Sequence, residues 1–354
     1  MAPLPPHEIQ ARVAVRQDEA ARARAQNHAA RYQYARPLGV TAVDLLDWMG
    51  NEDARLMFGL ADIDAALRGI ARGELCYVTG RAHSGKTQLI MHMIGENPKA
   101  RIMLFTPDEV DNLVLVKLIA RTHGINAAEL ERRVKGHDQA ATRLVRTVAE
   151  HTYANLMVND QSLTFHQMSQ ALREAEDQWG AAPDGVIVDY LDLLPGEADY
   201  NGTKGKSVAL KRWAKTERVP VVCIHQPKRG GAERGTRIGM DDMNQGGETE
   251  ATFVLGVYRK RDDYTLGQME QVRHTNTLSV NIDKNKRPPG HVGQYDFYMD
   301  PQSGRIRELC ASDLAQPGVP LNSLSEVLAA RERAMSTQPN VDHQIDRALR
   351  LVQG

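Results

Sequence analysis

The segment GRAHSGKT, residues 80–87, follows the apolar run LCYV and precedes the helix-forming segment TQLIMHMIGEN. It matches the pattern G-x-x-x-x-G-K-[ST], in which a loop between a strand and a helix surrounds phosphate groups with backbone N–H groups. Gly80 and Gly85 permit the backbone angles that this requires, and the helix N-terminus adds partial positive charge. The alternative is a glycine-rich turn without a ligand. A strand before it and a helix after it favour the phosphate loop.

Short apolar runs alternate with longer helix-forming segments from about residue 56 onward. This alternation predicts βαβ units, and so an α/β fold with a mainly parallel central sheet flanked by helices. Three later strand-like runs have no helices between them, and we expect them to complete the sheet in antiparallel fashion. The expected strands are residues 74–80, 101–107, 155–160, 185–194, 219–226, 252–260, 277–286 and 294–299. The expected helices between them are 87–97, 109–124, 162–180 and 206–218.

Composition limits the classes of partner. The formal net charge is −1, so any site for a polyanion must come from local clustering of basic residues. The three cysteines, Cys76, Cys223 and Cys310, fit no metal-binding spacing, which indicates a reducing, intracellular setting. No apolar run approaches the length of a membrane span, and no membrane partner is expected.

The phosphate loop predicts a site for ATP with Mg²⁺. Lys86 is expected to reach the β- and γ-phosphates, and Thr87 to offer its hydroxyl to the metal. Asp189 ends the apolar run GVIV, where a carboxylate can hold the metal as a Walker B acid does. The residues expected to line the nucleotide are Gly80, Arg81, Ala82, His83, Ser84, Gly85, Lys86, Thr87 and Gln88.

Hydrolysis also needs a group that orients water. Asp108 and Glu109 follow the strand-like run IMLF, and we expect one of them, slightly in favour of Glu109, to face the γ-phosphate. The alternative is that both cap the following helix. Gln226 ends the run VPVVCIHQ and is a candidate sensor of the γ-phosphate; the alternative is a polar residue that only ends a strand.

From Phe58 to about Leu309, the order of these elements resembles the RecA-like ATPases, most closely the ATPase domain of DnaB-type replicative helicases. Before the phosphate loop, FGLADIDAALRGIARGELCYVTG resembles the start of that domain. GVIVDYLDLL resembles the family's Walker B strand, and SVALKRWAKTERVPVVCIHQPKR resembles its LKxLAKExxVPVVxLSQLNR. RIGMDDMNQGGETEATFVLGVYR and NIDKNKRPPGHVG resemble two later family segments.

The resemblance implies a homo-hexameric ring whose ATP sites lie between subunits, with a lysine and an arginine of one subunit reaching the neighbour's γ-phosphate. The candidates are Lys284 and then Lys286 or Arg287, and Arg287 is preferred. The family usually has KQR or KNR where this chain has KNKR, so the finger is either shifted by one residue or replaced by lysine.

The resemblance also implies that two glycine-rich stretches, residues 195–205 and 227–250, contact single-stranded DNA in the ring's channel. The second carries four basic residues that could follow a phosphate backbone without reading sequence. These are Lys228, Arg229, Arg234 and Arg237. The alternative is a solvated run of charge.

The expected domains are an N-terminal helical arm or linker (1–55), a RecA-like ATPase domain (56–310) and a C-terminal helical tail (311–354). The resemblance does not include the family's N-terminal helical domain, which contacts primase, so contact with primase stays an open question. Other replisome proteins remain expected partners. An Ala- and Arg-rich version of this kind suits a phage of a GC-rich bacterium, acting in the host-cell cytoplasm.

The sequence therefore predicts an ATP-dependent DNA helicase of the DnaB type, acting in replication. Two other functions stay open. One is a filament-forming recombination ATPase of the RecA or RadA kind. The other is a RecA-fold ATPase switch that does not touch DNA.

Overall fold

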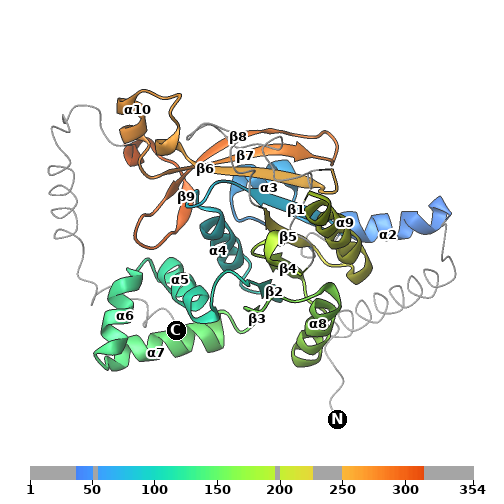
Figure 1. The fold of residues 1–354 in the computed structure, drawn as a ribbon, viewed down its shortest axis with the longest axis horizontal. Coiled ribbons are helices and arrows are strands. Elements are labelled where there is room, and N and C mark those ends of the chain that lie inside the picture. Colours follow the sequence, from blue (N-terminus) through green and yellow to red (C-terminus); the bar gives the residue numbers. More distant parts are fainter. Residues whose placement is uncertain (1–36, 51–54, 196–199, 226–248, 315–354) are drawn as a thin grey trace, which may run out of the picture. The chain divides into compact units, whose positions relative to one another are not determined.

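The computed structural model describes residues 37–50, 55–195, 200–225 and 249–314 (Figure 1). The chain divides into two compact units, Met1–Ala54 and Arg55–Gly354. The described part of the first unit is helix α2, Leu38–Gly50. Most of the predicted N-terminal arm and all but the start of the predicted C-terminal tail lie outside the described residues.

The second unit alternates strands and helices as predicted. Its strands are β1 (Leu75–Thr79), β2 (Ile102–Phe105), β3 (Leu156–Asn159), β4 (Gly185–Val188), β5 (Val221–His225), β6 (Phe253–Arg259), β7 (Thr277–Asn285), β8 (Gly293–Met299) and β9 (Ile306–Glu308). Its α-helices are α3 (Ala61–Leu67), α4 (Lys86–Glu96), α5 (Asp111–His123), α6 (Ala127–Lys135), α7 (Gln139–Thr147), α8 (Phe165–Trp179), α9 (Tyr200–Glu217) and α10 (Gln268–Arg273).

The described strands form one nine-stranded sheet in the order β3-β2-β4-β5-β1-β6-β7-β8-β9. Neighbouring strands from β3 to β6 pair in parallel, and those from β6 to β9 pair antiparallel. The fold is therefore the predicted α/β class with a mainly parallel sheet. Two details differ from the prediction. The first of the three later strands, β6, still pairs in parallel with β1, and the antiparallel part begins only between β6 and β7. A short helix, α10, also lies between β6 and β7, where no helix was expected.

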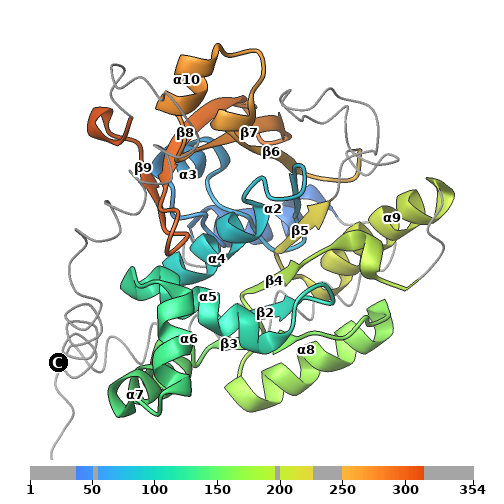
Figure 2. The ribbon, with the colours of Figure 1, turned by 60° about the vertical axis from the view of Figure 1, so that its left-hand side comes forward.

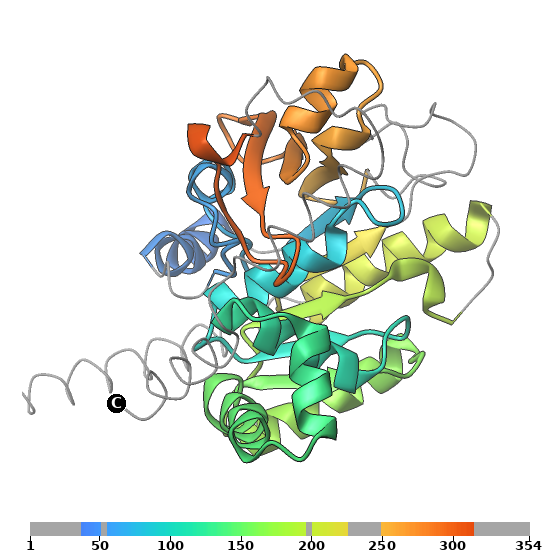
Figure 3. The same cartoon turned by 90° about the vertical axis from the view of Figure 1, so that its left-hand side faces the viewer.

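Helices cover both faces of the parallel strands (Figures 2 and 3). One core, to which Leu89 and Phe253 belong, packs the sheet against α3 to α7. The other core, to which Trp213 and Val254 belong, packs it against α8 and α9. Strands β1, β2, β4 and β5 are buried at every residue. Burial on both faces explains their continuous apolar sequences.

The topology brings several polar strand ends to one edge. Strands β2, β4, β5 and β1 are consecutive neighbours and parallel, so their carboxyl ends lie along the same edge of the sheet. Open α/β sheets bind ligands at this edge. None of the described helices combines the length and apolar character that crossing a bilayer requires.

Candidate functional site

The phosphate loop, residues 80–87, joins the end of β1 to the start of α4. Packing requires both of its motif glycines. A Cβ added at Gly80 would lie 2.3 Å from the carbonyl oxygen of Val257 in β6. Gly85 has a φ angle of 104°, and a Cβ there would lie 2.7 Å from Leu278 Cδ1 in β7. Since neither position has room for a side chain, the loop backbone lies directly against β6 and β7.

Lys86 is held inside the loop that it follows. Its Nζ donates hydrogen bonds of 2.7 Å to the carbonyl oxygens of Gly80 and Arg81. Burial lowers the pKa of Lys86 to about 8, and the negative charges of Asp189 and Asp108 oppose that change. The Lys86 ammonium group can exchange these carbonyl partners for the oxygens of a phosphate group enclosed by the same loop.

Thr87 and Asp189 meet at the sheet edge, where the Thr87 hydroxyl donates to Asp189 Oδ2 at 3.3 Å. Asp189 directly follows β4, and its backbone N–H donates to the carbonyl oxygen of Phe105 in β2. Burial raises the pKa of Asp189 to about 6, and the charges of Asp108 and Glu109 contribute to that rise. A hydroxyl and a carboxylate are hard oxygen ligands, and Mg²⁺ is commonly bound by one or two such carboxylates together with substrate phosphates.

Nothing in the described part of the chain resembles a protein-only metal cage of three or more His, Cys, Asp or Glu side chains. A nucleotide is nevertheless a good fit to the loop. The hydroxyls of Thr79 and Ser84 are buried without a hydrogen-bond partner among the described residues. Buried polar atoms of this kind normally have partners, so one of them directly before the loop and one within it fit a polar ligand.

Asp108 and Glu109 lie in the turn between β2 and α5. Helix α5 begins at Asp111, and its N-cap residue, Val110, makes no side-chain cap, so neither acid caps the helix. Glu109 Oε1 pairs with the Lys117 ammonium group, whereas Glu109 Oε2 is buried without a hydrogen-bond partner in the described residues. Glu109 is thus oriented through one oxygen and has the other available to accept a proton.

The remaining predicted lining residues lie at different places. Ala82 and His83 are exposed at the bend of the loop, and Arg81 is partly buried. Gln88 lies against the turn between β8 and β9, where a Cβ added at Gly304 would come within 2.3 Å of its Oε1 atom. The carbonyl of Thr249, before β6, accepts hydrogen bonds from both predicted interfacial lysines. Lys284 Nζ donates at 3.3 Å and Lys286 Nζ at 2.8 Å.

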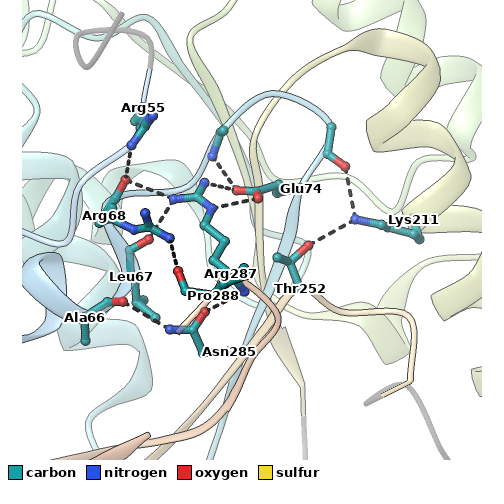
Figure 4. A network of polar contacts seen from close by, with 12 residues as sticks. Arg55, Ala66, Leu67, Arg68, Glu74, Lys211, Thr252, Asn285, Arg287 and Pro288 are labelled. Carbon is teal, nitrogen blue, oxygen red and sulfur yellow. Dashed lines mark hydrogen bonds and ion pairs between the residues drawn. The ribbon is translucent and has the colours of Figure 1, made fainter. Parts of the chain in front are cut away.

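Arg287 has a different environment from the one expected for an interfacial finger (Figure 4). It is only 6% exposed, and its guanidinium forms an ion pair with Glu74. It also donates to the carbonyl oxygens of Leu67, at 2.7 Å, and Arg68, at 3.1 Å, and lies 5.1 Å from the centroid of the Phe253 ring. The guanidinium therefore binds groups of its own chain, and it is not directed toward a neighbouring subunit.

The sequence model of the family described as DnaB-like helicase C terminal domain matches residues 56–308. The chain belongs to this family. It is accordingly a helicase-type ATPase with the RecA-like fold that the resemblance implied. No curated protein matches the chain in sequence.

Two solved structures share this fold. The ATPase domain of a phage DnaB-like helicase superposes with a TM-score of 0.66 at 18% identity, covering 78% of this chain and 100% of that one. A DnaB-like replicative helicase, described together with its interactions with primase, superposes with a TM-score of 0.63 at 18% identity. That match covers 86% of this chain and 75% of the other.

Several predicted residues of this DnaB-like domain lie outside the described residues: Gln226, Lys228, Arg229, Arg234 and Arg237. The first glycine-rich stretch, 195–205, is partly corrected by the structure. Its last six residues belong to α9, which begins at Tyr200. The Thr203 hydroxyl donates to Asp192 at 3.5 Å, and Lys206 Nζ donates to the Asp192 carbonyl at 3.0 Å, so this helical start is tied to the turn after β4.

Two further site residues escaped the sequence analysis. Lys117 orients Glu109 from α5, eight residues later in the chain. Glu109 lies in the turn before α5, so helical periodicity does not link it to Lys117 and no local pattern marks the pair. Glu74, the partner of Arg287, is 213 residues away from it, and no local pattern links the two.

Proposed function

We propose that this DnaB-like chain is a ring-forming, ATP-dependent DNA helicase that moves along single-stranded DNA and separates duplex strands during replication. One observation carries the proposal. Lys86, Thr87 and Asp189 converge at the carboxyl edge of the sheet, with the negative charges of Asp108 and Glu109 close enough to raise the pKa of Asp189. That is the set of groups that a phosphate loop needs in order to hydrolyse a nucleoside triphosphate.

ATP would be held by the backbone N–H groups of residues 80–87 and by Lys86. Mg²⁺ would be held by Thr87 and Asp189, and when bound it neutralises charge on the phosphate oxygens. Asp189 would ionise fully in that complex, because a cation next to a buried carboxylate favours its charged form.

Glu109 is the proposed general base. Lys117 fixes one carboxylate oxygen, and the other can accept a proton from water that attacks the γ-phosphate. Asp108, the second candidate, is exposed, and its contribution is then to the electrostatics of Asp189.

Lys284 and Lys286 are the proposed residues acting in trans on the neighbouring subunit of a hexamer. They lie two positions apart and bind the same carbonyl, so they present their ammonium groups together. Arg287 is removed from this role because its guanidinium is engaged with Glu74. The chain would therefore use a lysine where the family usually has an arginine, with a point charge in place of a planar fork.

DNA contact is assigned to Lys228, Arg229, Arg234 and Arg237, and Gln226 to sensing the γ-phosphate. The proposed domains remain 1–55, 56–310 and 311–354, with replisome proteins as further partners. We place the activity in the cytoplasm, of the host cell if a phage encodes the chain.

A strand-displacement assay on a forked DNA duplex tests the proposal. The wild type should unwind the fork with ATP and Mg²⁺, and Lys86→Ala should not. Lys99→Ala, which alters an exposed lysine after α4, is the matched control and should behave as wild type.

Three results would contradict the helicase assignment. Hydrolysis without strand separation would refute unwinding. Open helical filaments in single-particle images, in place of closed rings, would indicate a recombination ATPase. ATP turnover that single-stranded DNA leaves unchanged would indicate a switch.

A further inference from the structure

The last residue of β7 and the turn after it, residues 285–291, are joined to the C-terminal end of α3 and to the residue before β1 (Figure 4). Its side chains and carbonyls form hydrogen bonds with segments more than 200 residues earlier. The bonds are Asn285 Nδ2 to the Ala66 carbonyl at 3.1 Å, Arg68 Nη2 to the Pro288 carbonyl at 2.8 Å, and Arg287 Nη1 to the Leu67 carbonyl at 2.7 Å. The turn is thus fixed by contacts outside the sheet pairing.

Arg287 is the central residue of this network. Two of its nitrogens, Nε and Nη2, contact the two carboxylate oxygens of Glu74, which is a planar, two-point pairing. Glu74 directly precedes β1 and also accepts a hydrogen bond of 2.8 Å from the backbone N–H of Ala71. Strand β1 leads into the phosphate loop, so Arg287 connects the turn to the base of the strand that carries the chain's own nucleotide site.

A β-bulge sets the direction of the side chains near the end of β7. Leu255 pairs with Ile282, and its neighbour Val254 pairs with Lys284, so Asp283 is an extra residue on β7. Because side chains alternate between faces along a strand, one inserted residue moves every later side chain to the opposite face.

Beyond the bulge, the basic residues point to opposite faces of the sheet. Lys284 pairs with Val254, whose side chain packs in the core under α8 and α9. Lys286, two residues further, shares that face and binds the same carbonyl as Lys284. Arg287 lies over the ring of Phe253, which packs in the core under α3 to α7.

The surroundings of Lys211, in α9, agree with this division. Lys211 Nζ donates to the carbonyl of Gly73 at 3.1 Å and to the hydroxyl of Thr252 at 3.3 Å. Burial, and then neighbouring positive charges that include Lys286, lower the pKa of Lys211 to about 8. The carbonyl of Thr252 accepts the backbone N–H of Lys286, so Thr252 contacts both lysines.

We propose that Arg287 is a positioning residue, which fixes the turn after β7 so that Lys284 and Lys286 are held toward a neighbouring subunit's nucleotide. The proposal rests on the proposed function, in which those lysines act in trans. The arginine acts from the opposite face: it anchors the backbone on the α3 side, and this sets the orientation of the lysines on the α9 side. It touches neither the phosphates nor the reacting water.

The test uses variants that remove the anchor without leaving a buried charge alone. Arg287→Met by itself leaves the Glu74 carboxylate without its cationic partner, so this substitution is combined with Glu74→Gln. The glutamine side-chain oxygen can still accept the hydrogen bond from the Ala71 N–H. Arg287→Lys tests rescue by a conserved charge. Arg307→Met is the matched control, since Arg307 also pairs with a carboxylate, that of Asp313, and lies over a ring.

The Glu74→Gln/Arg287→Met variant should keep its KM for ATP within about threefold and lose about 10²-fold in kcat, the effect expected of misplacing a reacting group by about 1 Å. Arg287→Lys should recover part of kcat, and Arg307→Met should behave as wild type. A merely structural role predicts a different result, in which kcat stays at the wild-type level in protein that is folded.

Assemblies that mix subunits of two variants show whether the loss of ATPase activity acts across the interface between subunits. Subunits carrying Lys86→Ala cannot hydrolyse ATP but retain intact trans lysines, so mixing them with Glu74→Gln/Arg287→Met should raise ATPase activity above that of either protein alone. A Lys284→Ala/Lys286→Ala variant mixed in the same way should show the same recovery. If only the lysine variant recovers, the role of Arg287 is refuted and the proposed function stands. If neither mixture recovers, the trans role of the lysines fails, and the proposal for Arg287 fails with it.

Discussion

Replacing Asp189 by asparagine is expected to make the protein more stable while abolishing its ATPase activity. Burial places the pKa of Asp189 at about 6, against an ordinary value of 3.8, with Asp108 and Glu109 contributing. Between these two pH values the folded state binds more protons at this group than the unfolded state does. The stability of the wild type therefore falls as the pH rises through this window, and the full cost is present above pH 6.

The magnitude follows from the two pKa values. Each pH unit between them corresponds to about 1.4 kcal/mol, so the ionised carboxylate costs on the order of 3 kcal/mol at pH 7.5 and about half as much at pH 5. Asparagine has no charge to bury, and its amide oxygen can still accept from the Thr87 hydroxyl. Asp189→Asn should therefore exceed the wild type in free energy of unfolding by these amounts when no nucleotide or metal is present.

Urea unfolding at pH 5 and pH 7.5, without nucleotide or Mg²⁺, measures the difference. Asp184→Asn is the control with the opposite sign, because hydrogen bonds and the charge of Arg101 lower the pKa of Asp184 despite its partial burial. That control should destabilise the protein. The reasoning is refuted if Asp189→Asn is no more stable than the wild type at pH 7.5, or if its advantage fails to shrink at pH 5.

Three further outcomes are expected. Asp108→Asn removes a negative charge that raises the pKa of Asp189, so the acid limb of kcat/KM for ATP should move to lower pH; an unchanged limb between pH 5 and 8 would contradict this. Glu109→Gln should retain ATP binding, measured by calorimetry, and lose about 10²- to 10⁴-fold in kcat; full turnover would exclude it as the base. Gly80→Ala should lower the free energy of unfolding by about 1–3 kcal/mol because its Cβ meets a β6 carbonyl at 2.3 Å, whereas Gly205→Ala, with open space around it, should not destabilise the protein.

The sequence predicted the strands and helices best where the pattern was strong. The alternation of apolar runs and helix-forming segments located β1 to β5, together with α4, α5, α8 and most of α9. It left residues 125–154 unassigned, although α6 and α7 occupy 127–135 and 139–147. The side chains of Asn126 and Asp138 cap these helices, so the start signals were present. Few of their residues are buried, which leaves only a thin apolar stripe for a periodicity argument.

Helix α9 shows how tertiary contacts override propensity. Its first turns read YNGTKG, and two glycines so close together weaken an isolated helix by about 1 kcal/mol each. The structure extends the helix back to Tyr200 because Thr203 and Lys206 bind Asp192 in the turn after β4. Those partners lie 11 and 14 residues away, beyond the range of any local pattern.

The sequence alone determined the phosphate loop, the presence of the strands that lead into the site, and the acids that follow them. These features are local, since each depends on a few consecutive residues and on the rule that parallel strands end at one edge. Only the tertiary structure decided which basic residue near the end of β7 points outward. The single extra residue, Asp283, determines toward which face of the sheet Lys284, Lys286 and Arg287 point. The carboxylate of Glu74, 213 positions earlier, binds the arginine. Strand register and the pairing of distant charges arise only when the whole sheet is assembled, so consecutive residues cannot encode them on their own.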